Sequence, residues 1–356
     1  MIRVFVVDDS AIVRQKLTKE LNKHNDIQVI GTAIDPYVAR DKIVKLDPDV
    51  ITLDVEMPRM DGVTFLKRIM QYFPKPVIIV SSLTEKGSSL ALEAIEAGAV
   101  EVMCKPGGAY SVGDLSMQLA NVIRASANAN IKKKDYYSYK TKDNTKQKSK
   151  PANLARQKTG VSTKQIIAIG ASTGGTEAIK QILLNLPADT PGIVIVQHMP
   201  PQFTKTFAER LNSMCPMEVK EAEDGDKVML GHVLLAPGNF HMLLRKSGAD
   251  YSVSVKNGPM VHHQRPSVDI LLRSVAQTAG HNAIGALLTG MGSDGAKGLL
   301  EMKKAHSLTM VQNRESCVVF GMPQEALKLH AADLSLDIND MASAILRKVE
   351  QLKDNE

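Results

Sequence analysis

The first 125 residues alternate short apolar runs with segments that are apolar on one helical face. The apolar runs predict strands at 2–8, 27–34, 49–54, 76–81 and 100–104. The amphipathic segments predict helices near 11–24, 36–46, 62–72, 86–97 and 114–127. Five strand–helix units in alternation predict an α/β fold, with a parallel sheet covered by helices on both faces.

A second pattern of the same kind begins at Lys164 with the apolar run QIIAIGAS, followed by a helical segment and the run GIVIVQ. Further strands are expected at 232–236, 242–244, 250–256, 284–288 and 308–311. Long apolar runs are typical of parallel strands that are buried on both faces. We therefore expect a second α/β sheet, with a small antiparallel insert around 232–256.

The segment between these patterns loses its apolar periodicity. Residues 128–163 are rich in Lys, Ser, Thr, Asn and Gln, and such a composition cannot bury enough apolar surface to offset the entropy of ordering. The expected organisation is a first domain at 1–125, a flexible basic linker at 126–163 and a second domain at 164–354. Three tyrosines in the linker, Tyr136, Tyr137 and Tyr139, are unusual for a pure tether and are compatible with docking on one of the domains.

The net charge of +6 does not indicate a nucleic-acid-binding surface. Residues 126–160 hold nine lysines and one arginine against two aspartates, a local charge of +8, so the rest of the chain is near −2. No helix-turn-helix with a basic recognition helix is evident either. The chain has no apolar run long enough for a transmembrane helix and no signal-peptide pattern, and its three cysteines lack CxxC spacing. We expect a cytoplasmic protein with reduced thiols that does not insert into membranes.

Charged residues close three of the predicted strands in the first domain. Asp8 and Asp9 end one strand, Asp54 ends another and Lys105 ends a third. Carboxylates at the carboxyl ends of parallel strands can hold Mg²⁺, and an aspartate there can accept a phosphoryl group. Lysine supplies a compact positive charge beside it. Each residue alone is equally compatible with a solvated loop, whereas the combination, in this order and with each residue at the end of a strand, is specific for phosphoryl transfer to a carboxylate.

The run QIIAIGAS leads into GASTGG, and a helix is expected to begin near Thr176. Ser172 lies at the bend of this strand–turn–helix, which fits the G-x-S-x-G spacing of a nucleophile elbow. The rival interpretation is a turn that binds phosphate or a dinucleotide. The sequence is not G-x-G-x-x-G, and no acidic residue ends a strand about 20 residues later.

A histidine and an aspartate complete a candidate catalytic set. The apolar run GIVIVQ delivers His198 to the same edge of the sheet as Ser172, where it can act as a general base. Asp294 lies in the glycine-rich loop after the strand at 284–288, and its carboxylate can orient a histidine while the loop offers backbone N–H groups to an oxyanion. The alternative for Asp294 is an N-cap of the helix that follows, and the two roles are compatible. The order Ser, His, Asp differs from that of α/β-hydrolases, chymotrypsin and subtilisin.

The first domain resembles the receiver domain of two-component response regulators. The motifs that carry the resemblance are VVDDS, LDVEMPRMDG, VSS and CKP. It implies a flavodoxin-like (βα)5 fold, phosphorylation of Asp54 by a histidine kinase, Mg²⁺ held by Asp8, Asp9 and Asp54, and support of the phosphoryl group by Ser81 and Lys105. Many receivers have an aromatic switch residue three positions before the lysine, where this chain has Val102, so a rotating-aromatic mechanism is not expected.

The second domain resembles the catalytic domain of the chemotaxis methylesterase CheB. The resemblance rests on GASTGG, VQHMP, LLAPGNFHM, HHQRPSVDILL and LLTGMGSDGAKG. It implies a Rossmann-like doubly wound fold with Ser172 as nucleophile, His198 as base and Asp294 as orienting carboxylate. The backbone around Thr173 and Met291 would supply the oxyanion hole, and His241 and Arg265 would support the site.

Together the two resemblances imply a phosphorylation-regulated protein-glutamate methylesterase of bacterial chemotaxis. Its substrates would be glutamyl methyl esters, and glutamines, on methyl-accepting chemotaxis receptors, and the phosphodonor would be the chemotaxis histidine kinase. Ester hydrolysis would need no cofactor. The unphosphorylated receiver would pack against the catalytic face and hinder access to Ser172. The alternatives are a receiver linked to a nucleotide- or nucleic-acid-binding output module and a receiver fused to a small-molecule esterase.

Overall fold

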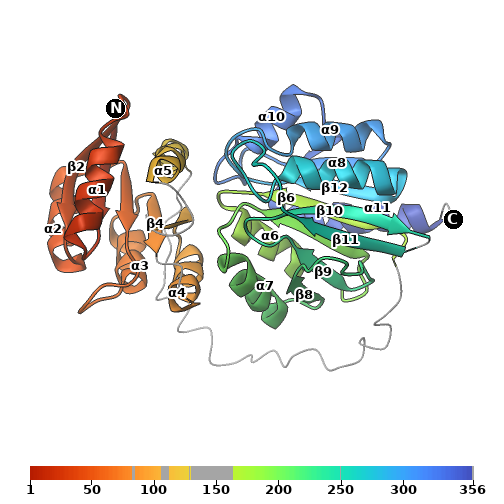
Figure 1. The fold of residues 1–356 in the computed structure, drawn as a ribbon, viewed down its shortest axis with the longest axis horizontal. Helices are drawn as coiled ribbons and strands as arrows, with labels where there is room; N and C mark the ends of the chain where they lie inside the picture. Colours follow the sequence, from red (N-terminus) through yellow and green to blue (C-terminus); the bar gives the residue numbers. More distant parts are fainter. Residues whose placement is uncertain (82–84, 106–111, 128, 130–162, 249, 355–356) are drawn as a thin grey trace. The chain divides into compact units, whose positions relative to one another are not determined.

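The computed structural model describes residues 1–81, 85–105, 112–127, 129, 163–248 and 250–354. The chain divides into two compact units, Met1–Lys150 and Pro151–Glu356 (Figure 1). Most of the predicted linker, including its three tyrosines, lies outside the described residues.

The first unit contains one five-stranded parallel sheet with the strand order β2-β1-β3-β4-β5. This is the 2-1-3-4-5 order of flavodoxin-like folds, which confirms the predicted fold class. Its strands are β1 Ile2–Val7, β2 Ile27–Ala33, β3 Val50–Leu53, β4 Val77–Ser81 and β5 Glu101–Cys104. Its helices are α1 Ala11–Leu21, α2 Pro36–Leu46, α3 Gly62–Tyr72, α4 Glu85–Glu96 and α5 Val112–Ala127.

Polar side chains start the first three helices. The side chains of Ser10, Asp35 and Asp61 accept hydrogen bonds from backbone N–H groups in the first turns of α1, α2 and α3. These N–H groups have no partner within the helix, so each cap fixes the residue at which its helix begins. The helices therefore start next to the carboxyl ends of the strands that precede them, where the charged residues lie.

The second unit contains one seven-stranded sheet with the order β14-β13-β12-β6-β7-β9-β8 and only parallel pairs. Its strands are β6 Ile166–Ala171, β7 Gly192–Gln197, β8 Glu218–Glu221, β9 His232–Leu235, β12 Ala283–Leu287, β13 Leu308–Gln312 and β14 Leu334–Leu336. Its helices are α6 Gly175–Leu184, α7 Phe203–Met214, α8 Val268–Ala279, α9 Ala296–Lys304, α10 Met322–Lys328 and α11 Ile338–Asp354.

The strand order of this sheet reverses next to β6. The chain passes from β6 to β7 on one side, and it later returns to place β12 on the other side. In open α/β sheets, ligands bind at such a switch point, outside the carboxyl ends of the strands. The segments that follow β6, β7 and β12 are those that contain Ser172, His198 and Asp294.

Two predictions about this sheet need correction. The antiparallel insert is smaller than expected, since only β10 (His241–Ser247) and β11 (Asp250–Lys256) form a hairpin, while β9 pairs in parallel with β7 and β8. The edge strands β8 and β14 were not predicted. Both strands are short. In β8 only Val219 is buried, and in β14 no residue is buried, so neither strand has the apolar run that marks the central strands.

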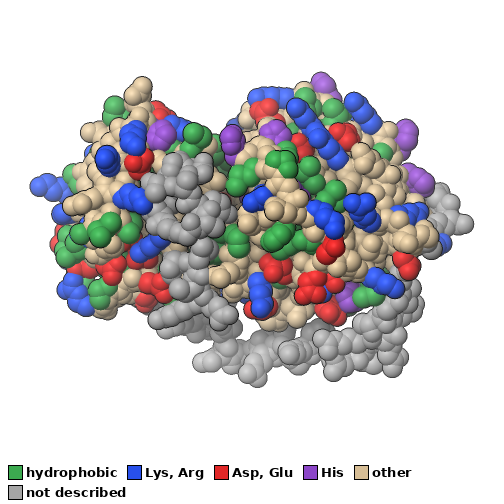
Figure 2. All heavy atoms as spheres, viewed as in Figure 1, with side chains coloured by type: hydrophobic (Ala, Val, Ile, Leu, Met, Phe, Trp, Pro, Cys, Tyr) green, Lys and Arg blue, Asp and Glu red, His purple; other side chains and the backbone are tan. Residues whose placement is uncertain are grey.

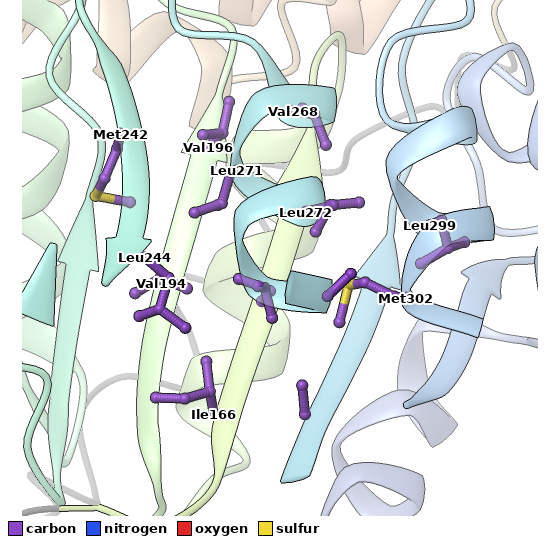
Figure 3. Packing of buried hydrophobic residues seen from close by; sticks show 14 of the residues in the cluster. Ile166, Val194, Val196, Met242, Leu244, Val268, Leu271, Leu272, Leu299 and Met302 are labelled. Carbon is purple, nitrogen blue, oxygen red and sulfur yellow. The ribbon is translucent and has the colours of Figure 1, made fainter. Parts of the chain in front are cut away.

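Helix α8 packs against the sheet beside the switch point, as Figure 3 shows for Val268, Leu271 and Leu272. The close approach of its first turn depends on Gly170, near the end of β6. A Cβ at this position would lie 2.1 Å from Cγ1 of Val268. The absence of a side chain at Gly170 therefore brings the N-terminus of α8 to the carboxyl end of β6.

Side chains of both charge signs are interspersed over the visible face of each unit (Figure 2). Among the described helices, none is long and apolar enough to cross a bilayer. The three cysteines are free thiols, of which Cys104 and Cys317 are buried.

Candidate active site and phosphorylation site

Ser172 lies in a tight turn between β6 and α6. Its backbone N–H donates to the carbonyl of Thr289 at 3.0 Å, and its carbonyl accepts from the N–H of Gly175 at 2.7 Å. Gly174 has a left-handed backbone with φ of 78°, a conformation that suits glycine, so the chain reverses sharply before α6. The strand–turn–helix expected from GASTGG is therefore present, and it leaves Ser172 8% exposed at the end of the strand.

His198 leaves the neighbouring strand at the same level. Ala171 and Gln197 are paired residues at the ends of β6 and β7, and the N–H of His198 donates to the carbonyl of Ala171 at 3.1 Å. Ser172 directly follows Ala171, and His198 directly follows Gln197. The two residues therefore leave adjacent strands side by side. The Ser172 hydroxyl makes no hydrogen bond to any described residue, as is common before a substrate tightens catalytic contacts.

His198 and Asp294 form a buried pair. Nε2 of His198 lies 2.8 Å from Oδ2 of Asp294, and the two side chains are 7% and 2% exposed. The same carboxylate accepts hydrogen bonds from the Ser267 hydroxyl at 2.8 Å, the Val268 N–H at 2.7 Å and the Asp269 N–H at 3.0 Å. Two of these donors are backbone groups in the first turn of α8, so a helix N-terminus holds the carboxylate.

This environment keeps Asp294 ionised. Burial alone would raise its pKa, but the His198 ring and the donors from Asp269 and Ser267 outweigh burial and lower the pKa to about 2. A carboxylate only accepts hydrogen bonds, so Nε2 of His198 is the nitrogen that carries the proton. Nδ1 is then the ring nitrogen left to act as a base.

The alternative role predicted for Asp294, an N-cap of the helix that follows it, is wrong. The N-cap of α9 is Gly295, without any side-chain hydrogen bond to the helix. Asp294 instead binds the N-terminus of α8, which precedes it in the chain by more than 20 residues. The carboxylate therefore serves a helix end and the histidine together.

The backbone around Thr173 and Met291 offers donors to an oxyanion. Neither of these N–H groups donates a hydrogen bond to a described residue. The loops that carry them are tied together by Thr289, whose buried hydroxyl donates to the Thr173 carbonyl at 2.9 Å and accepts from the Val319 N–H at 3.0 Å. Two unused donors on interlocked loops are the arrangement that can stabilise a negatively charged oxygen.

The two residues predicted to support the site, His241 and Arg265, each make hydrogen bonds to other segments of the chain. Nδ1 of His241 accepts from the N–H of Ser267, the residue whose hydroxyl donates to Asp294. Arg265 donates to the side-chain oxygens of Asn239 and Asn257 and to the Gly258 carbonyl. His241 thus joins β10 to the segment before α8, and Arg265 joins the loops at Asn239 and Asn257; their supporting role at the site stays a prediction.

The first unit places its charged strand ends together. Nζ of Lys105 lies 2.7 Å from Oδ2 of Asp54 and 3.0 Å from Oδ2 of Asp8. Burial, against the opposing effect of Lys105, raises the pKa of Asp54 to about 6. The predicted hydroxyl, that of Ser81, points elsewhere in this structure, since it donates to the Gly87 carbonyl at 3.3 Å. Val102 is buried.

The same aspartates suit a hard divalent cation. One carboxylate oxygen from each of Asp8, Asp9 and Asp54 lies within 4.8 Å of the others. Oδ2 of Asp8 is buried and accepts no hydrogen bond of good geometry, although the Lys105 ammonium is near. An unsatisfied carboxylate oxygen beside two further carboxylates fits Mg²⁺, which takes oxygen ligands.

Comparison with known proteins gives the same two parts. A family model for CheB methylesterase matches residues 167–345, and one for the response regulator receiver domain matches residues 4–112. A protein-glutamate methylesterase/protein-glutamine glutaminase 2 from Syntrophus aciditrophicus is 56% identical over 98% of this chain and 99% of its own length. The chain belongs to the CheB methylesterase family. It is a hydrolase of this family with a receiver domain at its N-terminal end.

Other CheB relatives extend the match. The protein-glutamate methylesterase/protein-glutamine glutaminase of Escherichia coli O157:H7 is 48% identical over 98% of this chain and 97% of its own length. The crystal structure of the Thermotoga maritima CheB methylesterase catalytic domain is 38% identical, with a TM-score of 0.51, and covers 51% of this chain and 97% of that chain. These CheB relatives give no support to a nucleotide- or nucleic-acid-binding output module.

Several residues of this CheB site were not predicted from the sequence. Ser267 and Asp269 contact the carboxylate of Asp294, and Thr289 and Gln197 contact the turn at Ser172. A signal existed for Ser267, since a serine before the apolar segment VDILL is typical of an N-cap. The other three act through contacts between distant segments, for which the sequence carries no local signal.

Proposed function

We propose that Ser172, His198 and Asp294 carry out the methylesterase and glutaminase chemistry of this family on chemoreceptors. The substrates are glutamyl γ-methyl esters and glutamines on the receptors. The observation that carries the proposal is the 2.8 Å pair of His198 and Asp294 beside the sharp turn that presents Ser172. A nucleophile, a base and a carboxylate that orients the base are the parts that acyl transfer requires.

The geometry supports one sequence of steps for the ester. Oγ of Ser172 attacks the ester carbonyl while Nδ1 of His198 takes its proton, and the developing oxyanion accepts from the N–H groups of Thr173 and Met291. The imidazolium then gives that proton to the departing methoxy oxygen, so methanol leaves and a glutamyl ester of Ser172 remains. Water attacks this ester, gives a proton to His198, and releases the glutamate side chain and the serine hydroxyl.

Deamidation follows the same steps with a different leaving group. Ammonia replaces methanol, and its nitrogen must be protonated by His198 before the bond to carbon breaks. Asp294 stabilises the imidazolium in both reactions, because its lowered pKa keeps it negative.

In the receiver, we propose that Asp54 accepts the phosphoryl group from the chemotaxis histidine kinase. Asp8, Asp9 and Asp54 would hold Mg²⁺, which supplies positive charge to the transferring phosphoryl oxygens. Lys105 then pairs with the acyl phosphate, and Ser81 is the hydroxyl available to contact it. The proposed boundaries are 1–125 for the receiver, 126–163 for the linker and 164–354 for the catalytic domain.

Replacement of the nucleophile tests the catalytic assignment. Ser172→Ala should abolish methanol release from methylated receptor fragments and labelling by a fluorophosphonate, with an unchanged circular dichroism spectrum. Ser293→Ala is the matched control, because Ser293 lies next to Asp294 in the glycine-rich loop but has no assigned role. Turnover of Ser172→Ala close to that of the parent chain would refute the serine mechanism.

A further inference from the structure

Gln197 is a buried polar residue at the centre of the active site that the reaction steps above do not use. It ends β7, directly before His198, and it is paired with Ala171, directly before Ser172. Its side chain is only 1% exposed in a strand that is otherwise apolar. A buried amide in such a strand calls for an account of its hydrogen bonds.

The amide of Gln197 contacts both proposed catalytic residues. Its Nε2 donates to the carbonyl of Ser172 at 2.9 Å and to the carbonyl of His198 at 3.1 Å. An amide nitrogen has two hydrogens, so each carbonyl can receive one. With the amide turned the other way, Oε1 would face two carbonyl oxygens, so the hydrogen-bond network fixes this orientation.

The contact with Ser172 also sets the direction of a proposed oxyanion donor. The carbonyl of Ser172 and the N–H of Thr173 belong to one planar trans peptide, in which the two groups point in opposite directions. The donors from Gln197 and Gly175 hold the carbonyl, and they thereby fix the line along which the Thr173 N–H points. A preorganised donor of this kind stabilises a transition state without reorganisation.

The other end of the amide is unfavourable for folding. Oε1 of Gln197 is buried and accepts no hydrogen bond from the described residues. It lies so close to Gly175 that a Cβ at this glycine would be 2.2 Å from it. An unpaired buried acceptor destabilises the folded state, which offsets part of what the two hydrogen bonds from Nε2 contribute. Residues that break a local rule of stability are expected at functional sites.

We propose that Gln197 is a positioning residue for the hydrolytic reaction. Its amide orients the Ser172–Thr173 peptide so that the Thr173 N–H faces the developing oxyanion, and it holds the backbone of His198 in register with that peptide. This inference rests on the proposed roles of Ser172 and His198.

The test compares Gln197→Met with a matched control in the full-length chain. Gln165→Met is that control, because Gln165 is also buried and also has an unpaired Oε1. Its Nε2 donates to a single carbonyl, that of Val349. Gln165 directly precedes β6, so it lies at the amino end of this strand, away from Ser172. The measurements are kcat and KM for methanol release, the rate of Ser172 labelling by a fluorophosphonate, and the Tm.

Gln197→Met should lower kcat and the labelling rate by about 10- to 100-fold, somewhat less than the loss of a whole oxyanion donor. KM should change by less than about threefold, and the Tm should fall in both variants, because each loses donors to backbone carbonyls. Gln165→Met should keep the kcat of the parent chain. A residue that merely closed the strand ends would lower the Tm in the same way but leave kcat of the folded fraction unchanged, and that unchanged kcat would overturn the inference.

A second variant covers poor folding of the first. Gln197→Leu also fills the buried position with an apolar side chain and removes the donors, so it should show the same loss of kcat, and parental kcat in this variant would also overturn the inference. If the parent chain itself were not labelled at Ser172, the proposed function would fail and this inference with it. Labelling of Ser172 in the parent with undiminished labelling in Gln197→Met would overturn this inference alone.

Discussion

Asp294 shows at the residue scale how one carboxylate stabilises a helix and prepares a catalytic base. Asp294→Asn would remove the negative charge from the first turn of α8 and replace one acceptor oxygen with a donor. We expect kcat to fall by about 10³- to 10⁴-fold, because the same change in a Ser-His-Asp protease costs about 10⁴-fold. The free energy of unfolding should fall by about 1–2 kcal/mol. Methanol release and urea unfolding measure the two effects.

The stability loss in Asp294→Asn should depend on pH in a defined direction. The pKa of Asp294 is about 2 in the folded protein, below its ordinary value of 3.8. Its ionised form therefore stabilises the folded state above pH ~4, and this contribution disappears as the pH falls towards ~2. The difference between variant and parent should shrink over that interval. A constant difference would mean that the loss comes from packing rather than from charge.

Asp54 should behave in the opposite way. Its folded pKa is about 6, above 3.8, so the folded receiver holds this proton more tightly than the unfolded chain does. That contribution to stability is complete below pH ~4 and is lost as the pH rises through ~6. Asp54→Asn, which stays neutral, should therefore be more stable than the parent at pH 8, on the order of 2 kcal/mol. Thermal unfolding with a chelator at pH 5 and pH 8 tests this, and equal stabilisation at both values would contradict it.

At the scale of elements, the sequence predicted the positions of the strands that are buried on both faces. Every strand of the first sheet was placed within one residue, because continuous apolar runs mark strands that are covered on both faces. The edge strands β8 and β14 were missed because they lack such runs. The partner of β9 was misjudged, since its sequence neighbours form a hairpin while its pairing strand β7 is distant in the chain. Ser172, His198 and Asp294 were identifiable as strand-end residues, but the contacts of Gln197 and Thr289 were not.

The hydrogen bonds of Arg265 to the loops on either side of the β10–β11 hairpin can be tested by substitution. Its guanidinium joins the loop before β10 to the loop after β11 through Asn239, Asn257 and Gly258. Lysine cannot reproduce this planar fork of donors. Arg265→Lys should lower the unfolding free energy by about 1–2 kcal/mol and activity by about tenfold, since the clamped loops adjoin the residues that hold Asp294. Arg245→Lys, at an exposed position of β10, is the control, and equal stability of both variants would refute the clamp.

At the scale of the whole molecule, the chain combines a phosphoacceptor unit with a hydrolase unit. Both fold classes followed from apolar patterning, and the family followed from long motifs at the strand ends. The catalytic domain of the Thermotoga maritima relative has a crystal structure of its own, so the corresponding part of this chain is expected to fold alone. The effect of one unit on the other is a property of the intact chain, and it requires a comparison of fragment and whole.

Phosphorylation of Asp54 should control the activity of the hydrolase. It would place added negative charge beside Lys105, Asp8 and Asp9, and a local change of this kind can shift a receiver between two states. We expect a fragment that begins near Val161 to release methanol faster than the unphosphorylated intact chain, because it lacks the inhibiting receiver. A small phosphodonor with Mg²⁺ should raise the activity of the intact chain. Asp54→Asn should abolish that response in the intact chain and leave its basal activity unchanged. A fragment less active than the unphosphorylated whole would show instead that the receiver activates the hydrolase or docks its substrate.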